Sequence, residues 1–304
     1  MQYDLVLFGN YTRDTIVSPA GTRSVDGGGF NYGAHVAAMM GLKTAAVTRL
    51  AREDIRVVEA LTRLGVDVYP TYTPDSTVLR LYYPTTNPDE RVLTVAKTAG
   101  PFTPDQFADL SARAFLINAS MRGEVGMDVI EELDKKGGLL VADLQGFVRV
   151  VSPDGTLQFE PWQEKAEVLA HIDILKTDAV EAEALTGEKD MKTAARKLAE
   201  LGPMEIVLTH RDGVLVLAQG EYFAAPFLPR KLVGRSGRGD TCIASYVARR
   251  LNATPAAATI WAAAVTSLKL EAEGPIKNSR ADVEALIRNR YASAPAVSPG
   301  GLPG

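Results

Sequence analysis

Residues 234–242, Gly-Arg-Ser-Gly-Arg-Gly-Asp-Thr-Cys, run directly into a helical pattern at residues 243–251. Glycines at 237 and 239 let the backbone turn sharply and approach a ligand closely. The unpaired N–H groups and the dipole of the following helix favour an anion at its first turn. Asp240 would stand beside that anion, where accepting a proton from an attacking hydroxyl gives it a role. A plain loop with an acidic N-cap explains the same residues, and this segment alone leaves both readings open.

Outside this segment, short β-rich runs alternate with helical patterns, which is typical of βαβ units around a mostly parallel sheet. The expected strands are residues 5–8, 44–50, 113–118, 139–143, 172–176 and 204–209. The expected helices are residues 31–40, 54–64, 124–136, 179–185, 191–201 and 256–264, with 243–251 after the glycine-rich segment. The predicted fold class is therefore α/β, with a central, mostly parallel sheet flanked by helices.

The alternation fails in two places, residues 11–25 and 66–96. In the second, residues 66–69, 77–83 and 91–95 resemble successive antiparallel strands, and a turn at 86–90 joins the last two. Strands without helices cannot bury both faces inside an α/β body, so we expect a small separate sheet, the predicted lid. It would cover a binding site and offer a surface for a homodimer.

The predicted domain organisation follows from this pattern. The body comprises residues 1–10, 26–65 and 97–290, and the predicted lid comprises residues 11–25 and 66–96. Residues 291–304 are rich in Pro, Gly and Ser, which predicts a disordered tail.

The composition is that of a globular protein, since 46% of the 304 residues are hydrophobic and 23% are charged. A formal net charge of −4 argues against a nucleic-acid partner. Cys242 is the one cysteine, which excludes a disulfide framework and a thiolate zinc site. The chain opens on MQYDLVLFGN, without the basic flank of a signal peptide, and has no run of about 18 apolar residues. We therefore expect a soluble, cytoplasmic protein without a membrane partner.

Four segments occur in the order found in the PfkB/ribokinase family of carbohydrate kinases. Gly9-x-x-x-x-Asp14 resembles the first substrate-binding motif of that family, and Gly27-Gly-Gly-Phe-Asn31 resembles its G-G-x-x-x-N segment. Lys176-Thr-Asp-Ala-Val-Glu181 resembles K-x-N-x-x-E, and Gly237-Arg-Gly-Asp240 resembles G-A-G-D. Several motifs in order are more specific than any one of them. The resemblance covers about residues 3–290 and implies a ribokinase-like fold with a β lid.

The resemblance also implies an activity: transfer of a phosphoryl group from ATP, with Mg²⁺, to a hydroxyl of a small sugar or polyol. The implied catalytic residues are Asp240 as the base and the backbone N–H groups of Gly237, Arg238 and Gly239 as the anion site. The implied substrate-binding residues are Asp14, Gly28, Gly29, Asn31 and Asp143. The implied ATP-binding residues are Lys176, Thr209, Arg211 and Gly213. Glu181 and Asp178 would order the metal ion, through water.

A few positions depart from the family pattern. Gly234 and Arg238 stand where the family usually has Asp and Ala, and Arg238 either adds a cation for the phosphates or points to solvent. Trp261 stands where a family asparagine often lies near adenine, which leaves the base pocket undefined. Substitutions around Asp26 and Asp143 argue against a plain ribokinase and favour a sugar or cyclitol acceptor over a nucleoside.

Three alternative functions stay open. One is a nucleoside kinase of the same family. A second is an NAD(P)-dependent oxidoreductase, suggested by Gly27, Gly29 and Gly33, although these glycines do not follow the first strand. The third is a non-catalytic sensor of sugars or nucleotides on the same fold, against which Asp240 and its glycines argue. A P-loop kinase is excluded because the chain has no Gly-Lys dipeptide.

Overall fold

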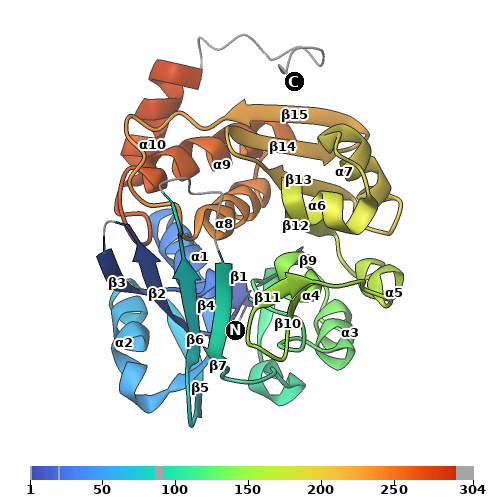
Figure 1. Cartoon of the computed structure of the whole chain (residues 1–304). Coiled ribbons are helices and arrows are strands. Elements are labelled where there is room, and N and C mark those ends of the chain that lie inside the picture. The colour runs from blue at the N-terminus through green and yellow to red at the C-terminus, as the bar shows by residue number, and fades with distance from the viewer. Residues whose placement is uncertain (1, 20, 86–91, 292–304) are drawn as a thin grey trace.

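The computed structural model describes residues 2–19, 21–85 and 92–291 (Figure 1). The predicted turn at 86–90 and nearly all of the predicted disordered tail, residues 292–304, lie outside the described residues. Within the described part, no helix is both long and apolar enough to traverse a bilayer.

A nine-stranded sheet forms the centre of the molecule, in the order β15-β14-β13-β12-β9-β8-β1-β4-β5. All neighbours from β13 to β5 run parallel, while β14 and β15 form an antiparallel edge. This confirms the predicted α/β class. The strands in chain order are β1 (Gln2–Phe8), β4 (Thr44–Ala51), β5 (Asp67–Thr73), β8 (Ser111–Ile117), β9 (Leu139–Asp143), β12 (Ile174–Asp178), β13 (Glu205–Thr209), β14 (Gly213–Ala218) and β15 (Glu221–Pro226).

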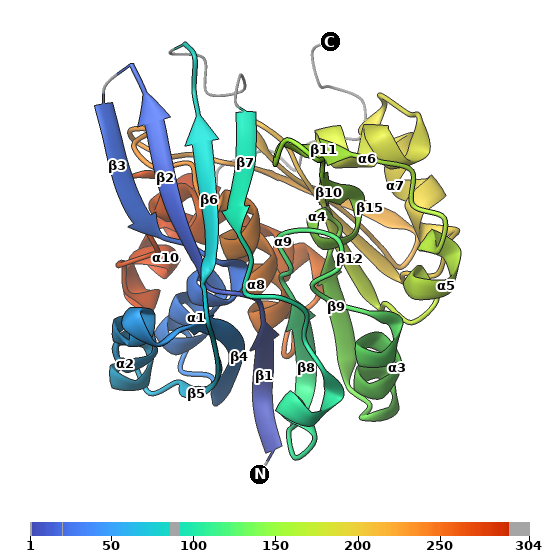
Figure 2. The same ribbon diagram turned by 60° about the horizontal axis from the view of Figure 1, so that its bottom comes forward.

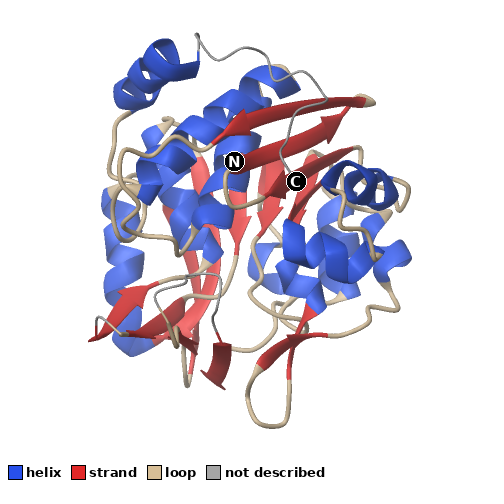
Figure 3. Ribbon diagram, turned by 45° about the horizontal axis from the view of Figure 1, so that its top comes forward, coloured by secondary structure: helices blue, strands red, loops and turns tan. Residues whose placement is uncertain are grey.

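Helices cover both faces of this sheet (Figures 2 and 3). In β1, Leu5 and Leu7 enter one hydrophobic core while Val6 and Phe8 enter the other, as the alternation of a buried strand requires. The first core is closed by α1 (Gly29–Met39), α2 (Ile55–Arg63), α8 (Arg238–Arg250), α9 (Pro255–Leu270) and α10 (Arg280–Leu286). The second is closed by α3 (Met127–Lys135), α5 (Lys165–Leu169), α6 (Ala179–Thr186) and α7 (Met191–Ala199).

A second, four-stranded sheet stands beyond the body, in the order β3-β2-β6-β7 (Figure 2). We call it the small sheet. Its strands are β2 (Thr12–Ser18), β3 (Gly21–Asp26), β6 (Thr77–Tyr82) and β7 (Val92–Lys97), and β2 pairs with β6 in parallel. Its one buried face holds Ile16, Leu79 and Leu81, packed with Met121 of the body.

The assignment of residues 66–73 to the predicted lid is wrong. Residues 67–73 form β5, which pairs in parallel with β4 at the edge of the central sheet. The reason is that α2 connects the two strands, so β4, α2 and β5 make one right-handed βαβ unit of the body.

A short hairpin joins the body to the small sheet. It consists of β10 (Arg149–Val151) and β11 (Leu157–Phe159), and it follows the short helix α4 (Gln145–Val148). The Val95 N–H of β7 donates to the Gly155 carbonyl at 2.8 Å, and Thr94 forms a β-bridge with Thr156. This hairpin is not among the strands expected from the sequence.

Candidate active site

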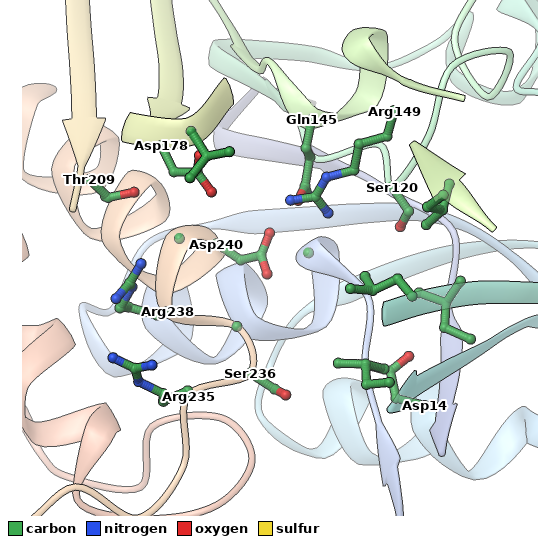
Figure 4. A pocket seen from close by; sticks show the side chains of 18 of the residues that line it. Asp14, Ser120, Gln145, Arg149, Asp178, Thr209, Arg235, Ser236, Arg238 and Asp240 are labelled. Atoms are coloured by element: carbon green, nitrogen blue, oxygen red, sulfur yellow. The ribbon is translucent and has the colours of Figure 1, made fainter. Parts of the chain in front are cut away.

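A cleft of about 670 Å³ lies between the central sheet and the small sheet. Its floor is formed by segments that follow β8, β9, β12 and β13, where the carboxyl ends of parallel strands meet. This is the edge at which open α/β sheets bind ligands. Figure 4 shows Asp240 in the cleft between Arg235 and Arg238 on one side and Asp14 on the other. The motifs from opposite ends of the chain therefore meet here.

Asp240 is the third residue of α8, so its carboxylate lies beside the unpaired N–H groups of the first helical turn. The Asn118 side chain, which follows β8, donates a hydrogen bond from Nδ2 to Asp240 Oδ1 at 3.3 Å. Asn118 itself is fixed because its backbone N–H donates to the Phe8 carbonyl at 2.8 Å. The carboxylate is thus oriented by the body while it faces the cleft.

The glycines of this loop are required by close contacts. Gly237 caps α8 in the left-handed region, with φ of 73°, and a Cβ there would lie 2.3 Å from the Tyr32 ring. At Gly239 a Cβ would lie 2.7 Å from the Lys176 ammonium. Both positions therefore bring the backbone close to neighbouring groups. The Arg238 N–H donates to the Arg235 carbonyl at 3.2 Å, so of the three N–H groups expected to hold an anion, those of Gly237 and Gly239 are the remaining candidates.

Two elements supply the expected acceptor-binding residues. Asp14 lies on β2, is only 8% exposed and lines the cleft. Gly28 and Gly29 line it as well, at the start of α1, where a Cβ on Gly29 would lie 2.8 Å from Asp240 Oδ1. Asn31 does not line the cleft, because its side chain points back and donates to the Asp26 carbonyl at 3.4 Å. Asn31 therefore supports the turn that precedes α1.

The wall opposite the body is apolar. Leu79 and Leu81 of β6 and Leu93 of β7 line the cleft, and Tyr83 continues this wall. The first two leucines are buried, so their side chains are held in one place by the core of the small sheet. Asp14 of β2 is the register partner of Leu79, so this otherwise apolar wall also carries one carboxylate, while the Gly28–Gly29 backbone lines the cleft from the start of α1.

Asp143 lies beneath the cleft surface and does not line it. It is fully buried and pairs with the Lys176 ammonium at 3.0 Å. Burial raises the pKa of Asp143, Lys176 opposes that rise, and Glu181 and Asp240 add to it. The sequence placed Asp143 in contact with substrate, but the structure places it behind Lys176, which does line the cleft. Asp143 therefore acts on the cleft through Lys176.

Glu181 is also hidden, and its carboxylate is already engaged. Oε1 accepts from Arg149 Nη2 at 2.7 Å, and Oε2 accepts from the Asp178 N–H at 2.9 Å in a capping box. Arg149 lines the cleft with its side chain 16% exposed. Burial lowers the pKa of Arg149, but Glu181, Asp178 and Asp143 outweigh it and raise the pKa. Glu181 therefore holds an arginine at the cleft instead of presenting its own oxygens.

The residues expected to order Mg²⁺ fit it only in part. Asp178 lines the cleft, whereas Glu181 does not. Among the described residues, no cluster of three or more His, Cys, Asp or Glu side chains could hold a metal ion. An ion that keeps its waters and binds substrate phosphates with one carboxylate, as Mg²⁺ commonly does, suits Asp178. The role expected of Glu181, to order the ion through water, stays a prediction, and both of its oxygens already accept hydrogen bonds from Arg149 and from the Asp178 N–H.

The remaining expected residues lie at the end of β13. Thr209 and Arg211 line the cleft, and His210 lies between them. Gly213 does not line it, because its carbonyl closes the turn by accepting from the His210 N–H at 3.0 Å. Arg238, the first residue of α8, lines the cleft, which favours the reading of a cation at the site over that of a solvent-exposed arginine.

Sequence reasoning missed several residues of the cleft. Arg149 follows the expected strand that ends at Asp143, but nothing in the local sequence indicated that its side chain would line the cleft. Tyr32, Ser120 and Arg235 also line the cleft. Five cationic side chains line the same cleft as Asp240, two of them paired with the buried carboxylates described above: Arg149, Lys176, Arg211, Arg235 and Arg238.

Comparison with known proteins identifies similar chains. The model of the pfkB family carbohydrate kinase matches residues 7–282. A curated cytidine kinase from Thermococcus kodakarensis is 27% identical over 257 residues, which span 81% of this chain and 87% of that protein. A pyrophosphate-dependent kinase in the ribokinase family, solved with a pyrophosphate analog and myo-inositol, is 34% identical with a TM-score of 0.85, and the match covers 92% of this chain and 99% of that chain. The ribokinase of Arabidopsis thaliana, solved with ribose and ATP, is 20% identical with a TM-score of 0.75, covers 95% of this chain and 99% of its own, and shows the fold alone.

Proposed function

The chain belongs to the pfkB family of carbohydrate kinases, and from this we propose that it transfers a phosphoryl group from pyrophosphate to a hydroxyl of a cyclitol or a related polyol. The enzyme is a phosphotransferase with a hydroxyl acceptor. The observation that carries the choice of donor is the group of five cationic side chains beside Asp240. The oxidoreductase and the non-catalytic sensor do not agree with this family.

The donor proposal rests on charge and on shape. Pyrophosphate carries its whole charge within two phosphate groups, and five cations in one cleft suit such a compact anion. A nucleotide would also need a slot for its base. Among the lining residues described for the segments that follow β12 and β13, the apolar ones are Ala179 and Val180, and Trp261 lies in the hydrophobic core instead. The pyrophosphate-dependent relative, at 34% identity, supports the same donor. ATP, the donor implied by the sequence motifs, is the alternative to be tested.

The acceptor proposal rests on the combination of hydrocarbon and polar groups in the lining of the cleft. A cyclitol ring presents C–H groups on its faces and hydroxyls around its rim. The leucines of the small sheet suit the ring face, while Asp14 and the backbone of Gly28 and Gly29 suit the hydroxyls. The relative solved with myo-inositol supports this class of acceptor.

In the proposed reaction, the oxygen of the acceptor hydroxyl forms a bond to phosphorus while Asp240 accepts the proton of that hydroxyl. The bridging P–O bond of pyrophosphate breaks, and inorganic phosphate leaves. The N–H groups of Gly237 and Gly239 and the ammonium of Lys176 hold the charge of the transferred group. A bound Mg²⁺ near Asp178 would neutralise phosphate charge further.

The small sheet would act as the lid in this reaction. Its apolar wall shields the acceptor from water, which otherwise competes for the phosphoryl group. Homodimer formation through this sheet stays a proposal from the sequence.

We expect turnover with pyrophosphate to exceed turnover with ATP by at least about tenfold, which corresponds to about 1.4 kcal/mol of barrier. The purified protein is assayed with Mg²⁺ and each donor at equal concentration, across myo-inositol, other polyols, sugars and cytidine. Product is quantified by phosphorus NMR and mass spectrometry. The Asp240→Asn variant serves as the blank for contaminating kinases.

Equal or faster turnover with ATP would contradict the donor proposal and leave the family assignment intact. A preference for cytidine over every polyol would instead overturn the acceptor proposal. If none of the acceptors gave turnover with either donor, the kinase activity expected of the family would itself be in question. One set of assays, with each donor tested against each acceptor, therefore distinguishes the three outcomes.

Removal of the charge on Asp14 should weaken the acceptor and spare the donor. We expect Asp14→Asn to raise KM for the acceptor about tenfold or more, because hydrogen bonds to a charged group contribute about 1.5–3 kcal/mol. KM for the donor should change by less than about twofold. The matched control is Asp26→Asn, an aspartate of β3 whose Oδ1 pairs with Arg56 and which does not line the cleft. Equal effects of both variants on acceptor KM would contradict the assignment.

A further inference from the structure

Lys269 is a buried lysine that the proposed reaction does not use. It is the penultimate residue of α9 and is 1% exposed. Its ammonium donates a hydrogen bond to the Gly234 carbonyl at 2.8 Å and lies 5.6 Å from the centre of the Tyr32 ring. Burial of a charged ammonium is costly unless it forms strong interactions. This lysine therefore needs an explanation, and its two contacts both belong to the surroundings of the loop before α8.

The end of α9 is the support on which that loop rests. The N–H groups of Val233 and Gly234 donate to the Leu270 carbonyl at 2.9 and 3.2 Å. A Cβ on Gly234 would lie 2.4 Å from the Ala272 carbonyl oxygen, so the loop reaches α9 only because residue 234 has no side chain. The departure of Gly234 from the family pattern thus coincides with the position that Lys269 bonds.

Tyr32 links the lysine to the anion site. Its ring lies against Lys269 on one side, and its edge lies where a Cβ of Gly237 would be. The ammonium therefore fixes the start of the loop directly, through Gly234, and its middle indirectly, through Tyr32.

We propose that Lys269 is a positioning residue whose ammonium holds the loop 234–239 in the shape that places its N–H groups on the transferred phosphoryl group. The inference rests on the proposed role of this loop, but not on the identity of the donor. It predicts that activity depends on the protonation of a residue that touches no substrate.

The charged groups around Lys269 determine the pH at which its ammonium loses the proton and no longer holds the loop. Burial lowers the pKa of Lys269 to about 8; Glu273 and Asp240 oppose the shift, and Arg238 adds to it. Glu273 is itself paired with Arg23 of the small sheet at 2.9 Å. Below pH 8 the ammonium is intact. Above it, a neutral amine forms a weaker hydrogen bond to Gly234, and the loop loses a nearby positive charge.

Loss of the same proton has the opposite effect on the stability of the folded protein, which increases as the pH rises. The folded protein gives up the Lys269 proton near pH 8, whereas an unfolded lysine keeps it until about 10.5. Between these values the unfolded state binds more protons, so this group increases the free energy of unfolding as the pH rises. A fall in activity caused by Lys269 will therefore occur without a loss of stability from this group.

The test compares three variants of the full-length protein between about pH 6.5 and 9.5, with the donor and acceptor that give turnover. Lys269→Met keeps the length and removes the charge, and Lys269→Arg keeps the charge at every pH used. Thr259→Val is the control, since it removes a buried hydroxyl that bonds the Pro255 carbonyl at the far end of α9. For each variant, kcat, both KM values and the melting temperature are measured.

We expect wild-type kcat to fall about tenfold from pH 7 to 9.5 at unchanged acceptor KM, because the loop acts on the transition state. Lys269→Met should start about tenfold lower and lose this pH dependence, Lys269→Arg should resist the fall, and Thr259→Val should follow wild type. A Lys269→Met enzyme within twofold of wild type, with the same profile, overturns the proposal. If that variant does not fold, a wild-type kcat that is flat to pH 9.5, or a fall shared equally by Lys269→Arg, overturns it as well.

Discussion

The Asp240→Asn variant is expected to lose at least about 10²-fold, and up to about 10⁴-fold, in kcat, the range that a positioned general base contributes. Asparagine has the same shape and accepts the Asn118 hydrogen bond through its oxygen, so the loop and α8 keep their geometry. Only the proton acceptor is removed. Donor KM should stay within about threefold, because the cations that bind the donor are untouched.

The control for this variant is Asp190→Asn, which changes the aspartate at the start of α7, outside the cleft lining. Initial rates under saturating donor and acceptor, together with a melting curve, measure both variants. A kcat for Asp240→Asn within about threefold of wild type would remove the base from the mechanism, since that factor corresponds to less than 1 kcal/mol of barrier.

The Arg149→Met variant should show the second-largest effect, a loss of about 10²-fold in kcat/KM for the donor. A guanidinium bound to a phosphate through charge-assisted hydrogen bonds contributes about 1.5–3 kcal/mol. The same change leaves Glu181 buried without its partner, which typically costs about 3–5 kcal/mol of stability. Two effects of one substitution therefore need to be separated.

A double variant separates them. Arg149→Met with Glu181→Gln removes the buried negative charge, and glutamine still completes the capping box with Asp178. Stability, measured by urea unfolding, should recover in large part, while kcat/KM for the donor stays low. Full recovery of activity in the double variant would show that Arg149 merely neutralises Glu181.

The matched control is Arg250→Met. Arg250 pairs with the mostly buried Glu205 at 2.9 Å, and neither residue lines the cleft. Its loss should lower stability without any specific effect on donor KM. A similar donor effect in this variant would attribute the kinetic loss to loosening of the fold.

Local patterns were sufficient where the chemistry of the site is local. The glycines before α8 and the acid behind them form one contiguous turn, so the sequence predicted the place of Asp240 in the cleft. The assignment of residues 66–73 was wrong although residues 44–69 already read as strand, helix, strand. An edge strand buries fewer apolar groups than a central one, and its weak apolar pattern hid the βαβ unit.

Contacts between residues that are far apart in the chain could not be predicted from the sequence. Glu181 matches the family motif, but its function here depends on Arg149, which lies 32 positions earlier in the chain. Asp143 ends a strand at the correct edge of the sheet, yet Lys176 covers it. Lys269 gave no signal at all, because a lysine near the end of a helix is usually a solvated residue that favours the helix dipole.

The packing of α1 against α8 has a consequence for the order in which the enzyme becomes competent during its synthesis. Asp14 and the glycines at the start of α1 are translated first, and Asp240 follows more than two hundred residues later. At about 5–20 residues per second, this delay is on the order of ten seconds or more. A nascent or prematurely terminated chain that ends before α8 therefore holds part of the acceptor site but neither the base nor the anion loop. Under the proposed mechanism, a chain that ends before α8 is therefore expected to lack phosphoryl transfer activity.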